Sequence, residues 1–457
     1  MRQSETKSRT IHVGALTRVE GEGALRIEWG AGGVERVELN IYEPPRFFES
    51  FLRGRPVEEV PDIVARICGI CPVAYQMSAC HALEKAVGAE ITPEIRALRR
   101  LLYCGEWIES HSLHVHLLHA PDFLGYESGM AMAADQREIV ERGLRMKEIG
   151  NRLLEILGGR AIHPINVTVG GFYRSPSVRR LNELLPELEW GLAAARETVD
   201  WVARFAFPEF ESTGLMVSLL HADEYPMNEG VIAASDGMRI DMESYLERFA
   251  ERHVAHSTAL HSVRMPEGEH YLVGPLARMN LAWQQLPPTA KACAVACGTS
   301  WPCRNNYRSI VARAVEMVAA FEEAIRIVSS YRSELTPACV ALPRRRGEGR
   351  HATEAPRGLL FHRYRVEDGC IAEATIVPPT SQNQGSIEAD LRRLAEEIET
   401  EPLDRATQRC EHLIRNYDPC ISCATHFLRL ERVPAAARRT GGAVGQRPEH
   451  ERRESES

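Results

Sequence analysis

Two CxxC pairs stand at opposite ends of the chain. The first pair, Cys68 and Cys71, lies in the stretch RICGICP, and the second, Cys420 and Cys423, lies in DPCISCATH. Each pair can turn two thiolates toward one metal ion. If both pairs bind at the same site, nearly the whole chain closes between them, so its two ends must meet at the protein's centre. Few folds satisfy that constraint.

Spacing alone leaves several interpretations open. A single CxxC pair is compatible with a thioredoxin-like redox motif, and two pairs are compatible with a structural zinc site of four cysteines. Local zinc modules, however, join their two pairs through roughly 15 to 20 residues. Here nearly the whole chain lies between the pairs, which weakens the zinc interpretation. Four thiolates suit soft or borderline transition metals generally, and geometry decides which metal is held.

Charge, hydropathy and cysteine content argue against several classes of protein. The 457 residues carry 55 basic against 63 acidic side chains, a net charge of -8, which offers no broad basic surface for nucleic acid. No run approaches the ~20 apolar residues that span a bilayer, and the first ten residues are polar. We therefore expect no membrane insertion, no secretion signal and a cytoplasmic location. Twelve cysteines are too few for a disulfide scaffold in a chain of this length.

The organisation indicates one large unit. No Pro/Gly/Ser-rich linker divides the chain before its end, so we expect a single interlocked domain over residues 1–430. Residues 431–457 are rich in Ala, Arg, Gly, Glu and Ser with few large apolar side chains. Such a tail cannot offset its ordering entropy by burial, and we expect it to be disordered.

The hydrophobic pattern predicts a mainly α (α+β) fold with a large helical core and short mixed sheets. Alternation at Leu25, Ile27 and Trp29, then at Val37, Leu39 and Ile41, predicts an N-terminal β-hairpin. Helical periodicity follows, and the expected helices are 72–88, 93–119, 133–157, 177–206, 307–332 and 386–415. Alternation over 371–377 predicts a strand, and 354–358 reads as a turn-rich loop before it.

The two cysteine motifs resemble those of the large subunits of nickel-iron hydrogenases. RICGICP and DPCISCATH look like the paired signatures of that family, and further blocks occur in the matching order from about residue 10 to residue 430. These blocks are Thr17–Gly21, Tyr271–Arg278, Glu354–Gly358 and Val377–Thr380. The sequence PVAYQ, which follows Cys71, resembles that of the cytoplasmic bidirectional, NADP-linked (sulfhydrogenase-type) group.

The resemblance implies a metal centre on the four cysteines. All four would bind nickel, Cys68 and Cys420 as terminal ligands, and Cys71 and Cys423 would also bridge to an iron that carries carbon monoxide and cyanide. Splitting dihydrogen needs a Lewis-acidic metal and a nearby base. Cys420 is the candidate base, and Glu20 matches the family carboxylate that accepts its proton. By composition alone, Glu20 would be a solvated turn acid beside Arg18.

Other motif positions would surround the iron's diatomic ligands. Arg357 and Thr380 match the positions that hydrogen-bond the cyanides, and Pro356 and Pro379 match the apolar wall of the pocket. An arginine after proline is more often a surface charge, so this role depends on the resemblance. Asp418 is a candidate partner that fixes the Arg357 guanidinium, as a buried arginine requires.

The family pattern also implies a second metal and a processing step. Glu49, the backbone carbonyl of Ile376 and His426 match a magnesium site that iron occupies in some relatives; oxygen ligands suit magnesium. In the family, nickel chaperones load the centre and an endopeptidase then cuts after the histidine at the position of His426. Residues 427–457 would therefore be removed on maturation.

Two positions depart from the pattern best known in the uptake hydrogenases. Tyr75 stands where many members place a histidine, and Ser110 stands where they place an aspartate. Tyr75 can still donate a hydrogen bond to a bridging thiolate.

The other histidines and cysteines have simpler interpretations. A helix crowded with histidines at 111, 114, 116 and 119 favours polar contacts within a helical core or a subunit interface. Cys293, Cys297 and Cys303 fit no standard iron-sulfur run and are expected to be small buried thiols. The same holds for Cys80, Cys104, Cys339, Cys370 and Cys410.

The resulting hypothesis is a catalytic hydrogenase subunit that splits dihydrogen heterolytically. The chain has neither a Gly-rich dinucleotide fingerprint nor a cluster-binding cysteine run, so partners must carry electrons to NADP or NAD. The expected partners are a flavin subunit that binds the nucleotide and an iron-sulfur small subunit. The alternatives are a hydrogen sensor, a non-catalytic subunit like those of respiratory complexes, and a zinc-stabilised scaffold. Relatives of the respiratory kind lack the cysteine pairs, and sensors typically lack the cleaved tail.

Overall fold

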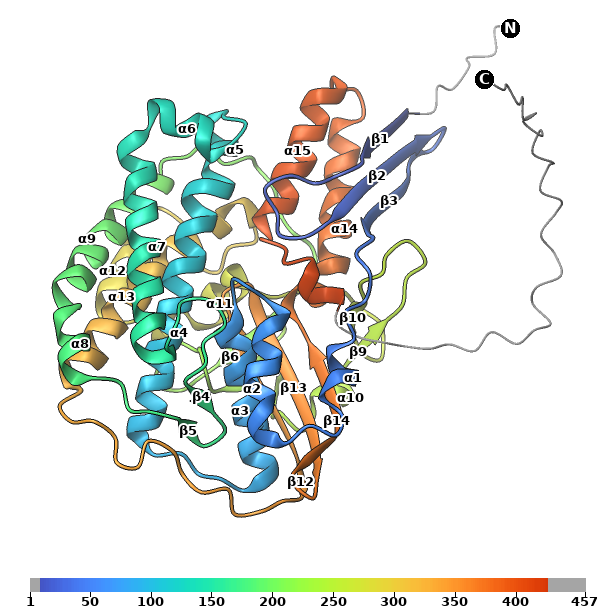
Figure 1. The fold of residues 1–457 in the computed structure, drawn as a ribbon. Helices are drawn as coiled ribbons and strands as arrows, with labels where there is room; N and C mark the ends of the chain where they lie inside the picture. Colours follow the sequence, from blue (N-terminus) through green and yellow to red (C-terminus); the bar gives the residue numbers. More distant parts are fainter. Residues whose placement is uncertain (1–8, 426–457) are drawn as a thin grey trace, which may run out of the picture.

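The computed structural model describes residues 9–425, and it is α+β, with helices over about half of the chain and several small sheets. Long helices gather on one side of the molecule and the sheet of β12 to β14 lies beside them (Figure 1). The N-terminal strands stand next to the last two helices. The first strands and the last helices of the described chain therefore lie together, as two distant halves of one metal site require.

The expected N-terminal hairpin is confirmed as β2 (Gly23–Gly30) and β3 (Gly33–Ile41), which pair antiparallel. A strand that the hydrophobic pattern did not reveal, β1 (Arg9–Val13), pairs antiparallel with β2. The apolar face of this sheet is buried with the C-terminal helices in one core cluster. Trp29 shows the contact directly, because its indole N–H donates to the Ala395 carbonyl at 3.1 Å.

The helical side is built from four long helices. They are α4 (Pro93–Leu113), α7 (Arg137–Gly158), α9 (Leu185–Val202) and α13 (Ser309–Ser330). The predicted helix over 93–119 runs on from α4 as a π-helical segment, His114–His119. The backbones of α4 and α7 approach closely where Gly105 and Gly150 meet, since a Cβ on Gly150 would lie 2.7 Å from the Gly105 carbonyl oxygen. That crossing leaves no room for a side chain.

Three predicted helices are interrupted. The pattern over 133–157 is divided at Gln136 between α6 (Gly129–Asp135) and α7. The pattern over 177–206 is divided between α8 (Val178–Glu183) and α9. The pattern over 386–415 belongs to α14 (Pro379–Ile398) and α15 (Leu403–Asn416), with Pro402 at the N-cap of α15. A proline in a helix interior removes a hydrogen bond and clashes with the preceding turn, so the chain breaks there.

The sheet nearest the cysteines is formed by β12 (Gly347–Ala355), β13 (Gly358–Glu367) and β14 (Cys370–Val377). It is antiparallel in the order β12-β13-β14, and the expected strand over 371–377 is confirmed. The expected loop over 354–358 is wrong in extent, because only Pro356 and Arg357 form the turn of a tight hairpin. Helix α3 (Pro72–Val87) packs against β12 and β13 and ends at Gly88, as predicted.

Shorter elements complete the described chain. The short helices are α1 (Phe48–Leu52), α2 (Val60–Val64), α5 (Ala120–Leu124), α6 (Gly129–Asp135), α10 (Tyr245–Arg248), α11 (Pro275–Ala282) and α12 (Pro288–Ala296). The remaining strands are β4 (Val167–Thr168), β5 (Gly171–Phe172), β6 (Leu215–Leu220), β7 (Val231–Ala234), β8 (Arg239–Ile240), β9 (Phe249–Arg252), β10 (His261–Arg264) and β11 (Tyr271–Leu272). Across residues 9–425, no helix combines the length and apolar character needed to cross a membrane.

The histidine-rich helix is a polar part of the core, which confirms that interpretation. All four side chains are buried and each makes a hydrogen bond within the chain: His111 to Glu316, His114 to the Arg415 carbonyl, His116 to the Ser112 carbonyl and His119 to Asn416. The expectation of buried thiols holds for Cys80, Cys104, Cys297 and Cys410. It is wrong for Cys293, Cys303, Cys339 and Cys370, which are half-buried.

Candidate metal centre

The four cysteines of the two CxxC pairs meet at one buried point. Their sulfur atoms all lie within 4.8 Å of one another, and no more than 4% of any of these residues is exposed. The Sγ atoms of Cys68 and Cys420, from opposite ends of the chain, are 3.5 Å apart. Four sulfur donors at this separation suit a soft or borderline transition metal ion.

Local structure aims each pair inward. Cys68 is extended after a 3-10 turn, and Cys71 is the N-cap of α3, with Pro72 at the first helical position. Proline is favoured there because its missing N–H would be unpaired anyway. The backbone N–H of Cys71 donates to the Cys68 sulfur at 3.2 Å. In the second pair, the N–H of Cys423 donates to the Cys420 carbonyl at 3.2 Å, which turns both sulfurs to one side.

One arginine connects the two pairs. Arg46 donates from Nη2 to the Ile67 carbonyl at 2.7 Å and also to the Ser422 carbonyl. Ile67 precedes the first cysteine, and Ser422 lies between the last two. Nothing in the local sequence around Arg46 indicated this role, because both acceptors are backbone carbonyls far away in sequence.

Glu20 reaches the site from the N-terminal segment. Its carboxylate oxygen Oε2 lies 3.1 Å from the Cys420 sulfur and accepts the Ser422 N–H at 3.2 Å. The Glu20 carbonyl also accepts the Ile421 N–H at 2.9 Å. Gly21 permits this approach, with a φ of 89° and a position where a Cβ would lie 2.7 Å from the Ile421 side chain. The structure therefore rejects the interpretation of Glu20 as a solvated turn acid.

Arg357 and Asp418 form a buried ion pair beside the sulfurs. The Arg357 Nη2 lies 3.1 Å from the Asp418 carboxylate, and its Nε donates to the Asp418 carbonyl at 2.8 Å. Burial alone would lower the pKa of Arg357, but Asp418 and the thiolates together raise it, so the arginine stays charged. Its Nη1 is buried and has no hydrogen-bond partner within residues 9–425. That N–H is a donor without an acceptor, which fits an anionic ligand beside the metal.

Thr380 and the two prolines border the same place. The Thr380 hydroxyl oxygen accepts the Cys420 N–H at 3.0 Å, and its own proton remains available to donate. Pro379 begins α14 directly before it, and Pro356 precedes Arg357 in the hairpin turn. Both prolines are buried.

The cysteine thiols can lose their protons here only if positive charge lies beside them. Hydrogen bonds from the other three thiols hold the pKa of Cys68 well below its usual value, whereas burial raises the pKa of Cys420. Several thiolates can therefore coexist in this pocket only with cations that compensate their charge. Arg357 supplies one charge, and a metal ion held by the cysteines would supply more.

Two of the three residues predicted to hold a second metal are in contact. Ile376 donates its N–H to the Glu49 carboxylate at 2.8 Å, which joins α1 to β14. The third, His426, lies outside the described residues. Tyr75 is buried, and its hydroxyl has no hydrogen-bond partner in the described chain, so the bond to a thiolate is not observed. Ser110 is also buried.

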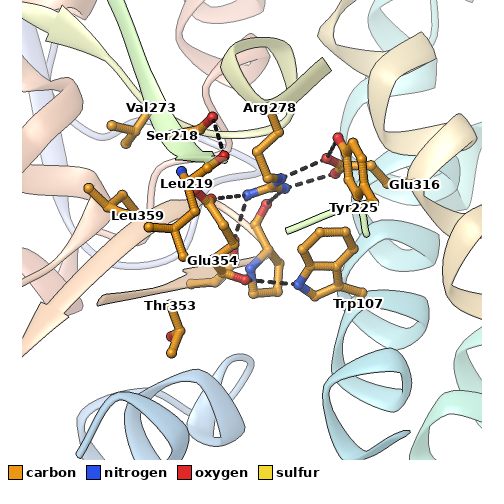
Figure 2. A network of polar contacts seen from close by, with 12 residues as sticks. Trp107, Ser218, Leu219, Tyr225, Val273, Arg278, Glu316, Thr353, Glu354 and Leu359 are labelled. Atoms are coloured by element: carbon orange, nitrogen blue, oxygen red, sulfur yellow. Dashed lines mark hydrogen bonds and ion pairs between the residues drawn. The ribbon is translucent and has the colours of Figure 1, made fainter. Parts of the chain in front are cut away.

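A second buried network holds the turn that carries Arg357 (Figure 2). Arg278 donates to Glu316 at 2.7 and 2.8 Å and to Glu354 at 2.9 Å, and all three side chains are fully buried. It also donates to the carbonyls of Ala355 and Pro356. Two sequence blocks that were noted separately, 271–278 and 354–358, are thus one structural unit.

The Arg278 network is also fixed from outside. The Trp107 indole donates to the Glu354 carbonyl at 3.0 Å, and its ring stacks 4.5 Å from the Arg278 guanidinium. Burial raises the pKa of Glu316, but the Arg278 charge outweighs it and lowers that pKa to about 2. Burial brings the pKa of Glu354 to about 7 despite the same arginine.

The fold and the four-cysteine pocket define a metal-binding protein, and comparisons with known proteins name its family. The profile of the family "Nickel-dependent hydrogenase" matches residues 46–142 and 263–426. The alpha subunit of sulfhydrogenase 1 from Pyrococcus furiosus is 36% identical over 428 residues, covering 92% of this chain and 98% of the relative. The chain belongs to the nickel-dependent hydrogenase family and is the large subunit of a hydrogenase.

Further relatives agree. A polypeptide of the F420-non-reducing hydrogenase of Methanothermobacter thermautotrophicus is 31% identical, over 90% of this chain and 94% of its own length. The solved structure of an NAD+-reducing [NiFe]-hydrogenase in the H2-reduced state superimposes with a TM-score of 0.83 at 26% identity. That alignment covers 92% of this chain and all of the solved one, so the fold is that of nickel-iron hydrogenase large subunits.

The Arg278 network makes a direct stability prediction. Arg278→Met leaves two carboxylates buried without their cation, which costs about 3–5 kcal/mol of unfolding free energy. Chemical denaturation of the purified chain measures this loss. Arg137→Met removes an exposed arginine and serves as the matched control, with stability close to that of the wild type. Equal stability of all three proteins would contradict the role assigned to Arg278.

Proposed function

We propose that this chain is the catalytic subunit of a complex that oxidises dihydrogen reversibly and passes the two electrons through partner subunits to NADP or NAD. The observation that carries the proposal is the buried convergence of four cysteines with Glu20 in hydrogen-bond reach of Cys420. The family and the hydrogenase names of the relatives support the same reaction.

The cysteines fit a binuclear centre. Cys68 and Cys420 would be terminal nickel ligands, and Cys71 and Cys423 would bridge nickel to iron. When bound, the centre supplies the Lewis acid that polarises dihydrogen for heterolytic cleavage. The Cys420 sulfur would take the proton and pass it to Glu20, whose oxygen lies 3.1 Å away. The Ser422 N–H keeps that oxygen oriented toward the sulfur.

Arg357 and Thr380 would hold the diatomic ligands of the iron. The Arg357 Nη1 is a buried donor without a partner in the described chain, and the Thr380 hydroxyl keeps a proton to donate after accepting from Cys420. Cyanide is an anionic acceptor, and buried acceptors need donors. Asp418 would orient the guanidinium, and Pro356 and Pro379 would exclude water from the pocket.

We also propose a magnesium or iron ion at Glu49, the Ile376 carbonyl and His426. The contact between Glu49 and the Ile376 backbone brings two of these groups together from α1 and β14. Residues 1–430 would form one interlocked domain, with the tail beyond His426 removed by a maturation endopeptidase after nickel chaperones load the site.

An isosteric substitution tests the proton route. Glu20→Gln keeps the hydrogen bonds that Glu20 accepts but removes the basic carboxylate, so hydrogen oxidation with a viologen dye should fall roughly 10²- to 10⁴-fold. Nickel content should stay unchanged. Glu22→Gln, two residues away and exposed, is the control and should keep full activity. Undiminished turnover in Glu20→Gln would remove Glu20 from the relay.

The electron acceptor is tested on the purified complex. The likeness to a solved NAD+-reducing [NiFe]-hydrogenase supports a nicotinamide acceptor. We expect hydrogen-dependent reduction of NADP+ or NAD+ at 340 nm. Two partners, one with iron-sulfur clusters and one with flavin, should copurify. Viologen reduction without reduction of either nucleotide would keep the hydrogenase and reject this acceptor.

Intact mass tests the processing step. The large subunit from active complex should have the mass of a chain that ends at His426, whereas protein made without nickel should retain residues 427–457. An active subunit that includes residues beyond 426 would contradict the cleavage.

A further inference from the structure

A second group of metal-ligating side chains lies outside the four-cysteine centre. His256 lies in the loop between β9 and β10, His261 begins β10, and Glu388 lies on α14. One ligand atom of each lies within 4.8 Å of the other two. Among residues 9–425, this trio and the four cysteines are the groups with such spacing.

His261 is buried and incompletely satisfied. Only 7% of the residue is exposed, and its Nε2 has no hydrogen-bond partner in the described part of the chain. A buried polar atom without a partner costs free energy, so each such atom needs an explanation.

The other two ligands are already in contact. The His256 Nε2 lies 2.7 Å from the Glu388 Oε1, within hydrogen-bond distance. A metal ion that binds between them would replace the proton of that hydrogen bond. The ring centroids of His256 and His261 are 5.7 Å apart and their planes are nearly perpendicular, at 85°.

The surrounding backbone holds these ligands in place. The Leu39 N–H of β3 donates to the Glu388 Oε1 at 2.9 Å, which fixes the carboxylate. In the loop between the histidines, Thr258 donates its N–H to the Ile41 carbonyl at 2.8 Å and its hydroxyl to the Glu43 carbonyl at 2.8 Å. The three ligands thus sit where β3, the β9–β10 hairpin and α14 come together (Figure 1).

We propose that His256, His261 and Glu388 bind one zinc(II) ion that fastens the β9–β10 hairpin to α14. Two imidazoles and a carboxylate are ordinary zinc ligands, and water would complete a tetrahedron. Ligand atoms around tetrahedral zinc lie roughly 3.3 Å apart. The separations here, from 2.7 Å to the 4.8 Å limit, bracket that value, so small side-chain shifts form the site.

Zinc content of the purified complex tests the proposal. After incubation with zinc sulfate and desalting, the wild type should hold about one zinc per large subunit more than the double variant His256→Gln/His261→Gln. Nickel content and hydrogen oxidation should be the same in both. His12→Gln, an exposed histidine on β1, is the control and should keep the zinc. Equal zinc in the wild type and the double variant would overturn the proposal.

X-ray absorption at the zinc edge supplies a test that needs no variant. Zinc at the proposed site has only nitrogen and oxygen neighbours at about 2.0–2.2 Å. Zinc misplaced in the four-cysteine centre would show sulfur neighbours at about 2.3 Å instead. A sulfur shell, or no bound zinc, would reject the site independently of whether the hydrogenase function holds.

Discussion

The structure depends on gathering four cysteine side chains in one buried pocket. Burial disfavours the thiolate form, so these thiols can lose their protons only where cations compensate the charge. The Arg357 guanidinium provides one, and its own partner Asp418 precedes the second cysteine pair by two residues. The charge that the pocket lacks is the charge that a metal centre brings.

Much of the remaining architecture serves to bring the two chain ends to that pocket. Arg46 links the carbonyls next to both pairs, and the segment at Glu20 runs alongside Cys420 through backbone hydrogen bonds. Arg278 holds the hairpin turn next to Arg357 by donating hydrogen bonds to the Ala355 and Pro356 carbonyls. Cys420 and Glu20 thus lie on backbone that is fixed from several directions, as the proposed proton transfer between them would require.

Elements with local sequence signals were predictable from the sequence, and contacts between distant segments were not. Helix α3 follows its proline start and glycine stop, and the hairpin of β2 and β3 follows simple alternation. The break at Pro402 had a local signal that the broad helical pattern concealed. No local signal indicated the roles of Arg46, the Arg278–Glu354 pair or strand β1, because their partners lie in distant segments of the chain. For Glu20 and Arg357, the residue types alone favoured surface roles, and only family likeness pointed to the pocket.

The central claim is that the four cysteines hold a nickel-iron centre. Elemental analysis together with infrared spectroscopy, on the chain purified with its native partners, tests it most directly. The account predicts about one nickel per chain, with absorption bands of metal-bound cyanide and carbon monoxide. Absence of nickel and of these bands, in protein made with its maturation machinery, would contradict it.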